Sequence, residues 1–135
     1  MTRPKLSAIS PSFIVTDVDR SIAFYRNKLG FEVRFREAGS PWFAVIGREG
    51  AQLFIKSEAG ITPVPNNKRH RHLRLDAFVY TADPAALAAE LAAKGVTFSS
   101  PLKGTADGLT GFELADPDGY ILFFGCPTSE VRPTT

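Results

Sequence analysis

Hydrophobic and polar positions along this chain follow two periods, and the order in which these periods occur is repeated. Residues 13–16 are β-branched and aromatic, which predicts a strand. After them, Ile22, Tyr25 and Leu29 recur at helical spacing until Gly30 ends the predicted helix. Alternation then predicts three strands, at residues 31–37, 42–46 and 51–56. The first half of the chain is therefore predicted to be one β-α-β-β-β unit.

The second half of the chain repeats this order. Residues 75–81 predict a strand, and Asp83 offers an N-cap oxygen to a helix that extends to Lys94. A short strand is expected at residues 96–98, and a hairpin is expected from residues 109–115 and 120–124. The fold class predicted from this pattern is α+β, with two tandem β-α-β-β-β units.

The hairpin turn Asp116-Pro117-Asp118-Gly119 is the strongest local signal in the sequence. Pro117 presets the φ angle of a turn, and Gly119 supplies the positive φ that strains other residues. A weaker copy of this hairpin, with its turn ending at Gly50, lies in the first half. At one fixed offset Phe13 is paired with Phe78 and Gly30 with Gly95, which indicates an internal duplication.

The 135 residues are expected to form a single domain, residues 1–135. Within it we expect unit one at about 7–57, a linker at 58–72, unit two at 73–126 and a C-terminal tail at 127–135. The linker is rich in Gly, Pro and Asn, which disfavour both helix and strand. Both ends, up to Lys5 and from Thr128 onward, are expected to be loose.

Charge and cysteine content exclude several classes of protein. A single cysteine, Cys126, rules out an internal disulfide and a cysteine-based zinc site. The net charge of +2 is too small to indicate nucleic acid, and the basic run at residues 68–72 is typical of a solvated loop. No segment approaches the roughly 20 apolar residues of a membrane span, and no signal peptide follows Met1. We therefore expect a cytoplasmic protein without membrane or nucleic-acid partners.

Two motifs resemble the vicinal oxygen chelate superfamily. They are Thr-Asp-Val-Asp-Arg-Ser-Ile-Ala-Phe-Tyr-Arg-Asn-Lys-Leu-Gly-Phe at residues 16–31 and Ala-Asp-Pro-Asp-Gly-Tyr at residues 115–120. That superfamily contains glyoxalase I, bleomycin resistance proteins and extradiol dioxygenases. The resemblance implies that the sheets of the two units curl around a cleft, with the helices outside. It also implies a homodimer, since members with short units often build each cleft from two chains.

Metal-dependent members of the superfamily hold one divalent ion through a His or Gln near the start of each unit's first strand and a Glu on each unit's last strand. The corresponding positions here are Ser10, Asp76, Phe123 and either Phe54 or Gln52. Phenyl rings have no lone pair to donate, and the remaining groups fall short of a usual donor set. Neither a metal, nor a cofactor, nor a catalytic residue is therefore expected. His70 and His72, among the cations of the linker, are a poor metal site.

The same positions predict an apolar cleft for an organic molecule. Alternation along residues 74–80 places polar and aromatic side chains on one face of that strand, opposite to the small apolar side chains that suit helix packing. The predicted ligand-binding residues are Phe54, Phe78, Phe123, Asp76, Tyr80, Gln52, Arg74, Ser10, Ser12 and Trp42. Aromatic faces also favour cations, and Asp76 could supply a counter-charge. The alternative is that these rings only fill the core.

The resulting hypothesis is a metal-free protein that sequesters an aromatic or cationic small molecule, similar to the bleomycin resistance branch and with a role in antibiotic resistance. The alternative is a metal-dependent lyase, isomerase or dioxygenase with a displaced metal site that uses Asp76, Glu113 or a histidine. Residue types alone leave both open.

Overall fold

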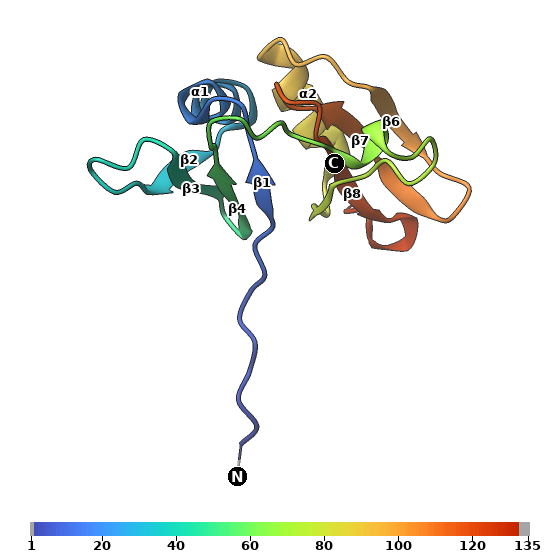
Figure 1. Cartoon of the computed structure of the whole chain (residues 1–135). Helices are drawn as coiled ribbons and strands as arrows, with labels where there is room; N and C mark the ends of the chain where they lie inside the picture. Colours follow the sequence, from blue (N-terminus) through green and yellow to red (C-terminus); the bar gives the residue numbers. More distant parts are fainter. Residues whose placement is uncertain (1, 133–135) are drawn as a thin grey trace.

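The structure is a computed structural model that describes residues 2–132, and it contains two units of one helix and four strands each (Figure 1). Unit one consists of β1 (Ser12–Ile14), α1 (Val18–Leu29), β2 (Glu32–Phe35), β3 (Phe43–Arg48) and β4 (Ala51–Lys56). Unit two consists of β5 (Ala77–Tyr80), α2 (Pro84–Ala93), β6 (Ser100–Gly104), β7 (Leu109–Ala115) and β8 (Ile121–Pro127). Two short 3-10 helices are η1 (Asn66–Lys68) and η2 (Thr128–Glu130). The predicted order of elements is confirmed.

Both α-helices begin at an aspartate. The Asp17 side chain accepts a hydrogen bond from the Arg20 amide (3.1 Å), and the Asp83 side chain accepts one from the Ala86 amide (3.2 Å). These side chains satisfy amides that have no partner inside a helix. Gly30 ends α1 with a φ of 75°, a conformation that glycine adopts without strain. No helix in the described range 2–132 is long and apolar enough to cross a membrane.

Each unit forms its own four-stranded mixed sheet, with the same topology in both units. The strand order is β1-β4-β3-β2 in unit one and β5-β8-β7-β6 in unit two. The first strand of each unit is parallel to its last strand, and the other pairs are antiparallel. β1 and β5 are thus edge strands of their sheets. This repeated topology confirms the duplication that the sequence indicated.

Some predicted boundaries are wrong. Residues 96–98 are not a strand, because Val96 and Phe98 pack against the core as part of a loop and β6 begins only at Ser100. The C-terminal segment is not loose up to Arg132. The Thr128 amide donates to the Gly108 carbonyl (2.8 Å), and the Arg132 amide donates to the Ala82 carbonyl (2.7 Å). Residues 133–135 of the predicted tail lie outside the described residues.

The two units share one hydrophobic core, and the turn between β7 and β8 joins them. Tyr120, directly after this turn, stacks on Phe13 of β1 with ring centroids 4.1 Å apart, and its hydroxyl donates to the Ile14 carbonyl (2.5 Å). Oδ1 of Asp118 accepts hydrogen bonds from the Thr16 amide (3.1 Å) and hydroxyl (2.6 Å) and from Arg20 (3.0 Å). The predicted turn therefore also holds unit two against unit one.

Asp116 makes a buried hydrogen bond between the units. Its Oδ2 accepts a hydrogen bond from the Tyr25 hydroxyl of α1 (2.8 Å), while its Oδ1 accepts from the amides of Asp118 (2.9 Å) and Tyr120 (3.0 Å). Burial raises the pKa of Asp116 from 3.8 to about 6, although these hydrogen bonds oppose the shift. Burial, and then the nearby Asp116, raise the pKa of Tyr25, so its phenol remains a donor at neutral pH.

The raised pKa of Asp116 predicts how stability depends on pH. Because the folded pKa (about 6) exceeds the unfolded value (3.8), the protonated form is favoured in the folded state. The stabilisation from this proton is complete below about pH 3.8 and is lost as pH rises through about 6. We expect the titration of Asp116 to lower the unfolding free energy of the native protein by ~3 kcal/mol between pH 4 and 7. In Asp116→Asn, whose side chain cannot titrate, this decrease should be absent. Urea unfolding of both proteins across this range measures it, and parallel pH profiles would contradict the assignment.

Candidate functional site

A cavity with a volume of about 780 Å³ lies between the two units. Its walls come from the segment before β1, the start of β4, strand β5 and the inner faces of both helices. The helices and β8 contribute mainly apolar residues to the lining, and these are Tyr25, Leu29, Leu87, Leu91, Leu122 and Phe124. A cavity of this size and lining suits a small organic molecule.

Half of the ten predicted ligand-binding residues line this cavity, namely Ser10, Gln52, Asp76, Phe78 and Tyr80. Trp42 instead lines a separate pocket on unit one. Four predicted residues line neither cavity, and these are Ser12, Phe54, Arg74 and Phe123. Alternation assigned Ala77 and Val79 to the face that suits helix packing, and both pack against the core. It did not indicate where the two units meet.

Both carboxylate oxygens of Asp76 accept hydrogen bonds from backbone amides, one in its own unit and one in the linker. Its Oδ1 accepts a hydrogen bond from the Asn66 amide (2.9 Å), and its Oδ2 accepts one from the Ile121 amide (2.8 Å). One carboxylate thus fixes both the 3-10 turn η1 and the start of β8 beside β5. Asp76 therefore lines the cavity with both of its oxygens already bonded to backbone amides.

Ser10 and Gln52 are two of the polar residues in the cavity wall. The Gln52 side-chain amide donates to the Ser10 hydroxyl (3.2 Å), and the Gln52 carbonyl oxygen accepts a long hydrogen bond from Arg34 (3.4 Å). This pair joins the segment before β1 to β4. Because a hydroxyl and an amide can each donate and accept, the pair can exchange its mutual bond for bonds to a ligand.

Three of the aromatic residues predicted to bind a ligand form a connected group on the sheet of unit two. The Phe78 ring lies 4.9 Å from the Tyr80 ring and 5.1 Å from the Phe123 ring, measured between centroids. Phe123 covers Gly111 and Gly125, where an added Cβ would lie 2.6 and 2.8 Å from its ring atoms. The two glycines face each other across β7 and β8, which leaves space for the ring to lie flat. On unit one, Phe54 contacts Phe43 instead, at 5.8 Å.

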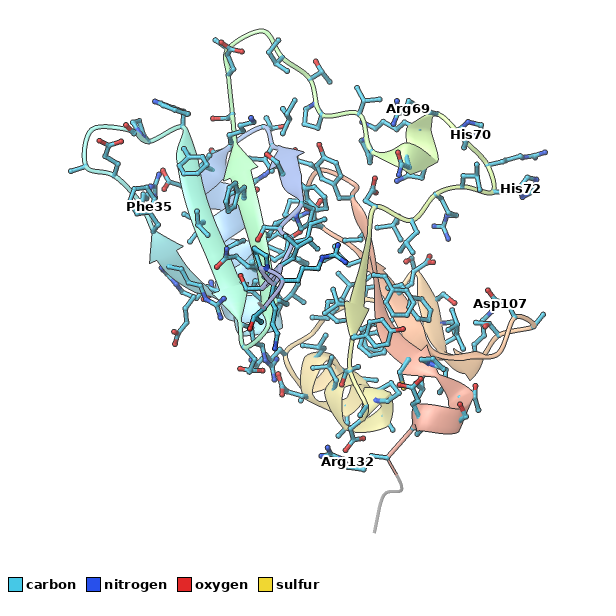
Figure 2. The ribbon with its side chains drawn as sticks, turned by 90° about the horizontal axis from the view of Figure 1, so that it is seen from below. Phe35, Arg69, His70, His72, Asp107 and Arg132 are labelled. Atoms are coloured by element: carbon cyan, nitrogen blue, oxygen red, sulfur yellow. The ribbon has the colours of Figure 1, made fainter. Side chains whose placement is uncertain are left out.

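The residues at the superfamily's metal positions do not fit a metal ion. Phe54 and Phe123 have no donor atom, Ser10 and Gln52 bind each other, and Asp76 binds two amides. Glu113, the alternative donor on β7, forms an ion pair with Arg74 (2.5 Å). Within residues 2–132, no group of three or more His, Cys, Asp or Glu side chains could hold a metal. His70 and His72 lie on the linker loop that projects from the body (Figure 2).

Sequence reasoning missed the contribution of the helices to the cavity. Tyr25, Leu29 and Leu91 follow ordinary core periodicity, so no sequence signal separates them from the rest of the core. It also missed Arg48, whose guanidinium forms two hydrogen bonds to Glu90 of α2 (2.7 and 2.9 Å) and one to the Leu29 carbonyl (3.1 Å). This bidentate pair closes the cavity on the side of the β3–β4 turn.

Comparison with known proteins gives one family and many similar structures. A family model described as "Glyoxalase/Bleomycin resistance protein/Dioxygenase superfamily" matches residues 8–124. No curated protein matches the chain.

Solved structures share the fold at low sequence identity. One is a bleomycin-binding protein from Streptomyces verticillus complexed with copper(II)-bleomycin, with 23% identity, a TM-score of 0.68, and coverage of 92% of this chain and 98% of that one. TioX from Micromonospora sp. ML1 has 18% identity, a TM-score of 0.69, and coverage of 90% and 98%. A superfamily member from Sphaerobacter thermophilus has 25% identity, a TM-score of 0.63, and coverage of 89% and 97%.

The hydrogen bonds of Asp76 predict that this residue is structural. In Asp76→Asn one acceptor oxygen becomes an amide group that faces a backbone donor, so we expect a loss of ~1–3 kcal/mol of unfolding free energy. Asp107→Asn is the matched control, because Asp107 lies at the tip of the β6–β7 hairpin (Figure 2). Urea unfolding measures both variants, and equal stability of the two would contradict this role.

Proposed function

Since this chain belongs to the glyoxalase/bleomycin resistance protein/dioxygenase superfamily, we propose that it is a metal-free binding protein that sequesters a small organic molecule with flat rings. The proposed site is the cavity between the units. No bond is broken in this function, and affinity comes from burial and from the few polar groups of the wall.

The observation that supports this proposal most directly is the lining of the cavity. Phe78 and Tyr80 line a space of about 780 Å³ together with aliphatic and aromatic residues of the two helices and β8. Ser10 and Gln52 supply hydrogen-bonding groups that can fix the orientation of a ligand. The negative charge of Asp76 favours a ligand that is neutral or cationic over an anionic one.

The comparison with solved structures supports the same class of function. The Streptomyces verticillus protein binds copper(II)-bleomycin. We extend the proposal to a role in resistance, a homodimeric assembly and a cytoplasmic location.

Thermal-shift measurements against a panel of aromatic natural products, bleomycin included, test the proposal. A compound that binds only the folded state raises the melting temperature in a concentration-dependent way. Removing the Phe78 ring deletes a stacking and burial surface, so we expect Phe78→Ala to weaken binding about tenfold or more. Phe35→Ala is the matched control, because Phe35 is exposed and lines neither cavity. A hit whose affinity is the same in Phe78→Ala and Phe35→Ala would place the ligand elsewhere.

Chelation separates this proposal from the metal-dependent alternative. We expect treatment with EDTA, followed by removal of the chelator, to leave the ligand-induced increase in melting temperature unchanged, because the residues at the metal positions lack free donors. Added Zn²⁺, Mn²⁺ or Ni²⁺ should not strengthen ligand binding. Loss of the ligand effect after EDTA, with recovery on adding one of these ions, would favour the lyase, isomerase or dioxygenase reading.

A further inference from the structure

A second pocket, of about 560 Å³, lies on unit one and shares no lining residue with the cavity between the units. It is lined by Ile14, Trp42, Lys56, Ser57, Glu58, Ala59 and Ile61. These residues come from the ends of β1 and β4, from the residue before β3, and from the start of the linker. The volume is within the range of small-molecule sites.

Trp42 forms one wall of this pocket, and neighbouring residues hold it in place. Its carbonyl accepts a hydrogen bond from the Ser57 amide (2.9 Å), and its ring contacts Phe43 with centroids 5.9 Å apart. The preceding residue, Pro41, is held by Arg36 through a hydrogen bond to the Pro41 carbonyl (3.1 Å). Although these contacts support the ring, the residue remains 53% exposed. A flat aromatic surface is thus fixed but available.

A turn in the linker forms the opposite wall. The Ile61 amide donates to the Glu58 carbonyl (3.0 Å), and Gly60 has a φ of 83°, which a residue with a side chain adopts only with strain. This turn brings Ala59 and Ile61 to the same pocket as Ile14 and Trp42. Four of the seven lining residues are therefore apolar, two from the sheet side of the pocket and two from the linker turn.

The pocket also contains one cation and one anion, each without an ionic partner. Within residues 2–132, neither Lys56 nor Glu58 takes part in an ion pair or a side-chain hydrogen bond, although they are two residues apart. Lys56 lies opposite Ile14 on β1 and Phe43 on β3, so it stands at the apolar face of the sheet. Both charged groups can therefore receive a ligand's charges.

We propose that this pocket binds a zwitterionic ligand of the α-amino-acid type with an aromatic side chain. The ligand's carboxylate binds Lys56, its ammonium group binds Glu58, and its ring packs against the indole of Trp42. A ligand with only one charge would leave the other lining charge without its partner, which makes the zwitterion the best match. This site is independent of the ligand proposed for the cavity between the units.

Fluorescence of Trp42, the only tryptophan of the chain, tests the proposal directly. The probes are L-phenylalanine, N-acetyl-L-phenylalanine, which is only anionic, and L-phenylalanine amide, which is only cationic. With indole excited selectively, we expect phenylalanine to give a saturable change. Each singly charged probe should bind about tenfold more weakly, because one charge-assisted contact is lost. Equal binding of the three probes, or no saturable change in fluorescence and no heat by calorimetry with any of them, overturns the proposal.

Charge variants identify the two contacts. We expect Lys56→Gln to weaken binding of phenylalanine and of the N-acetyl probe about tenfold and to leave the amide probe unchanged. Glu58→Gln should have the converse pattern. Lys103→Gln, an exposed change on β6, is the control and should leave all three affinities unchanged. Unchanged affinities in both pocket variants, or the same loss in the control, would contradict the assignment. The melting temperature of each variant shows whether it is folded.

Discussion

The hydrogen bond from Tyr25 to Asp116 is the contact on which the arrangement of the two units depends. The same carboxylate accepts two amide hydrogen bonds inside its own turn, so one side chain both shapes the β7–β8 turn and attaches it to α1. An unpaired carboxylate at this depth would be costly, which makes the turn and the docking of the units interdependent. The cavity between the units exists because this junction and the core hold the units side by side.

The duplicated units contact each other through equivalent turns, whose contacting side chains have opposite charges. The acidic β7–β8 turn of unit two contacts α1, through Asp116 to Tyr25 and Asp118 to Arg20. At the β3–β4 turn of unit one, the base Arg48 contacts Glu90 of α2. The last hairpin turn of each unit thus contacts the helix of the other unit. The Arg48–Glu90 pair raises the pKa of Arg48 and lowers that of Glu90, so both remain charged.

The sequence allowed the elements to be predicted, but only part of the site. Helix caps and strand alternation are local properties, and they identified α1, α2, β4 and β7 nearly to the residue. Alternation also assigned Ala77 and Val79 to the side of β5 that packs against the core. Which strand edges face the cavity depends on how the units dock, and no local pattern encodes this, so Phe54 and Phe123 were placed in the cleft although neither lines it. The hydrogen-bond partners of Asp76 are likewise set by the tertiary structure, since Ile121 is far away in the sequence.

The chemistry of the cavity follows from what its polar groups already bind. Asp76 uses both oxygens to hold η1 and β8, and Glu113 is paired with Arg74. Phe123 lies on two glycines of its own sheet, and its ring has no donor atom. Each position that could have presented an acidic oxygen therefore serves the fold or carries a ring. A cavity built in this way discriminates between ligands by shape, by aromatic contact and by the exchangeable Ser10–Gln52 hydrogen bond.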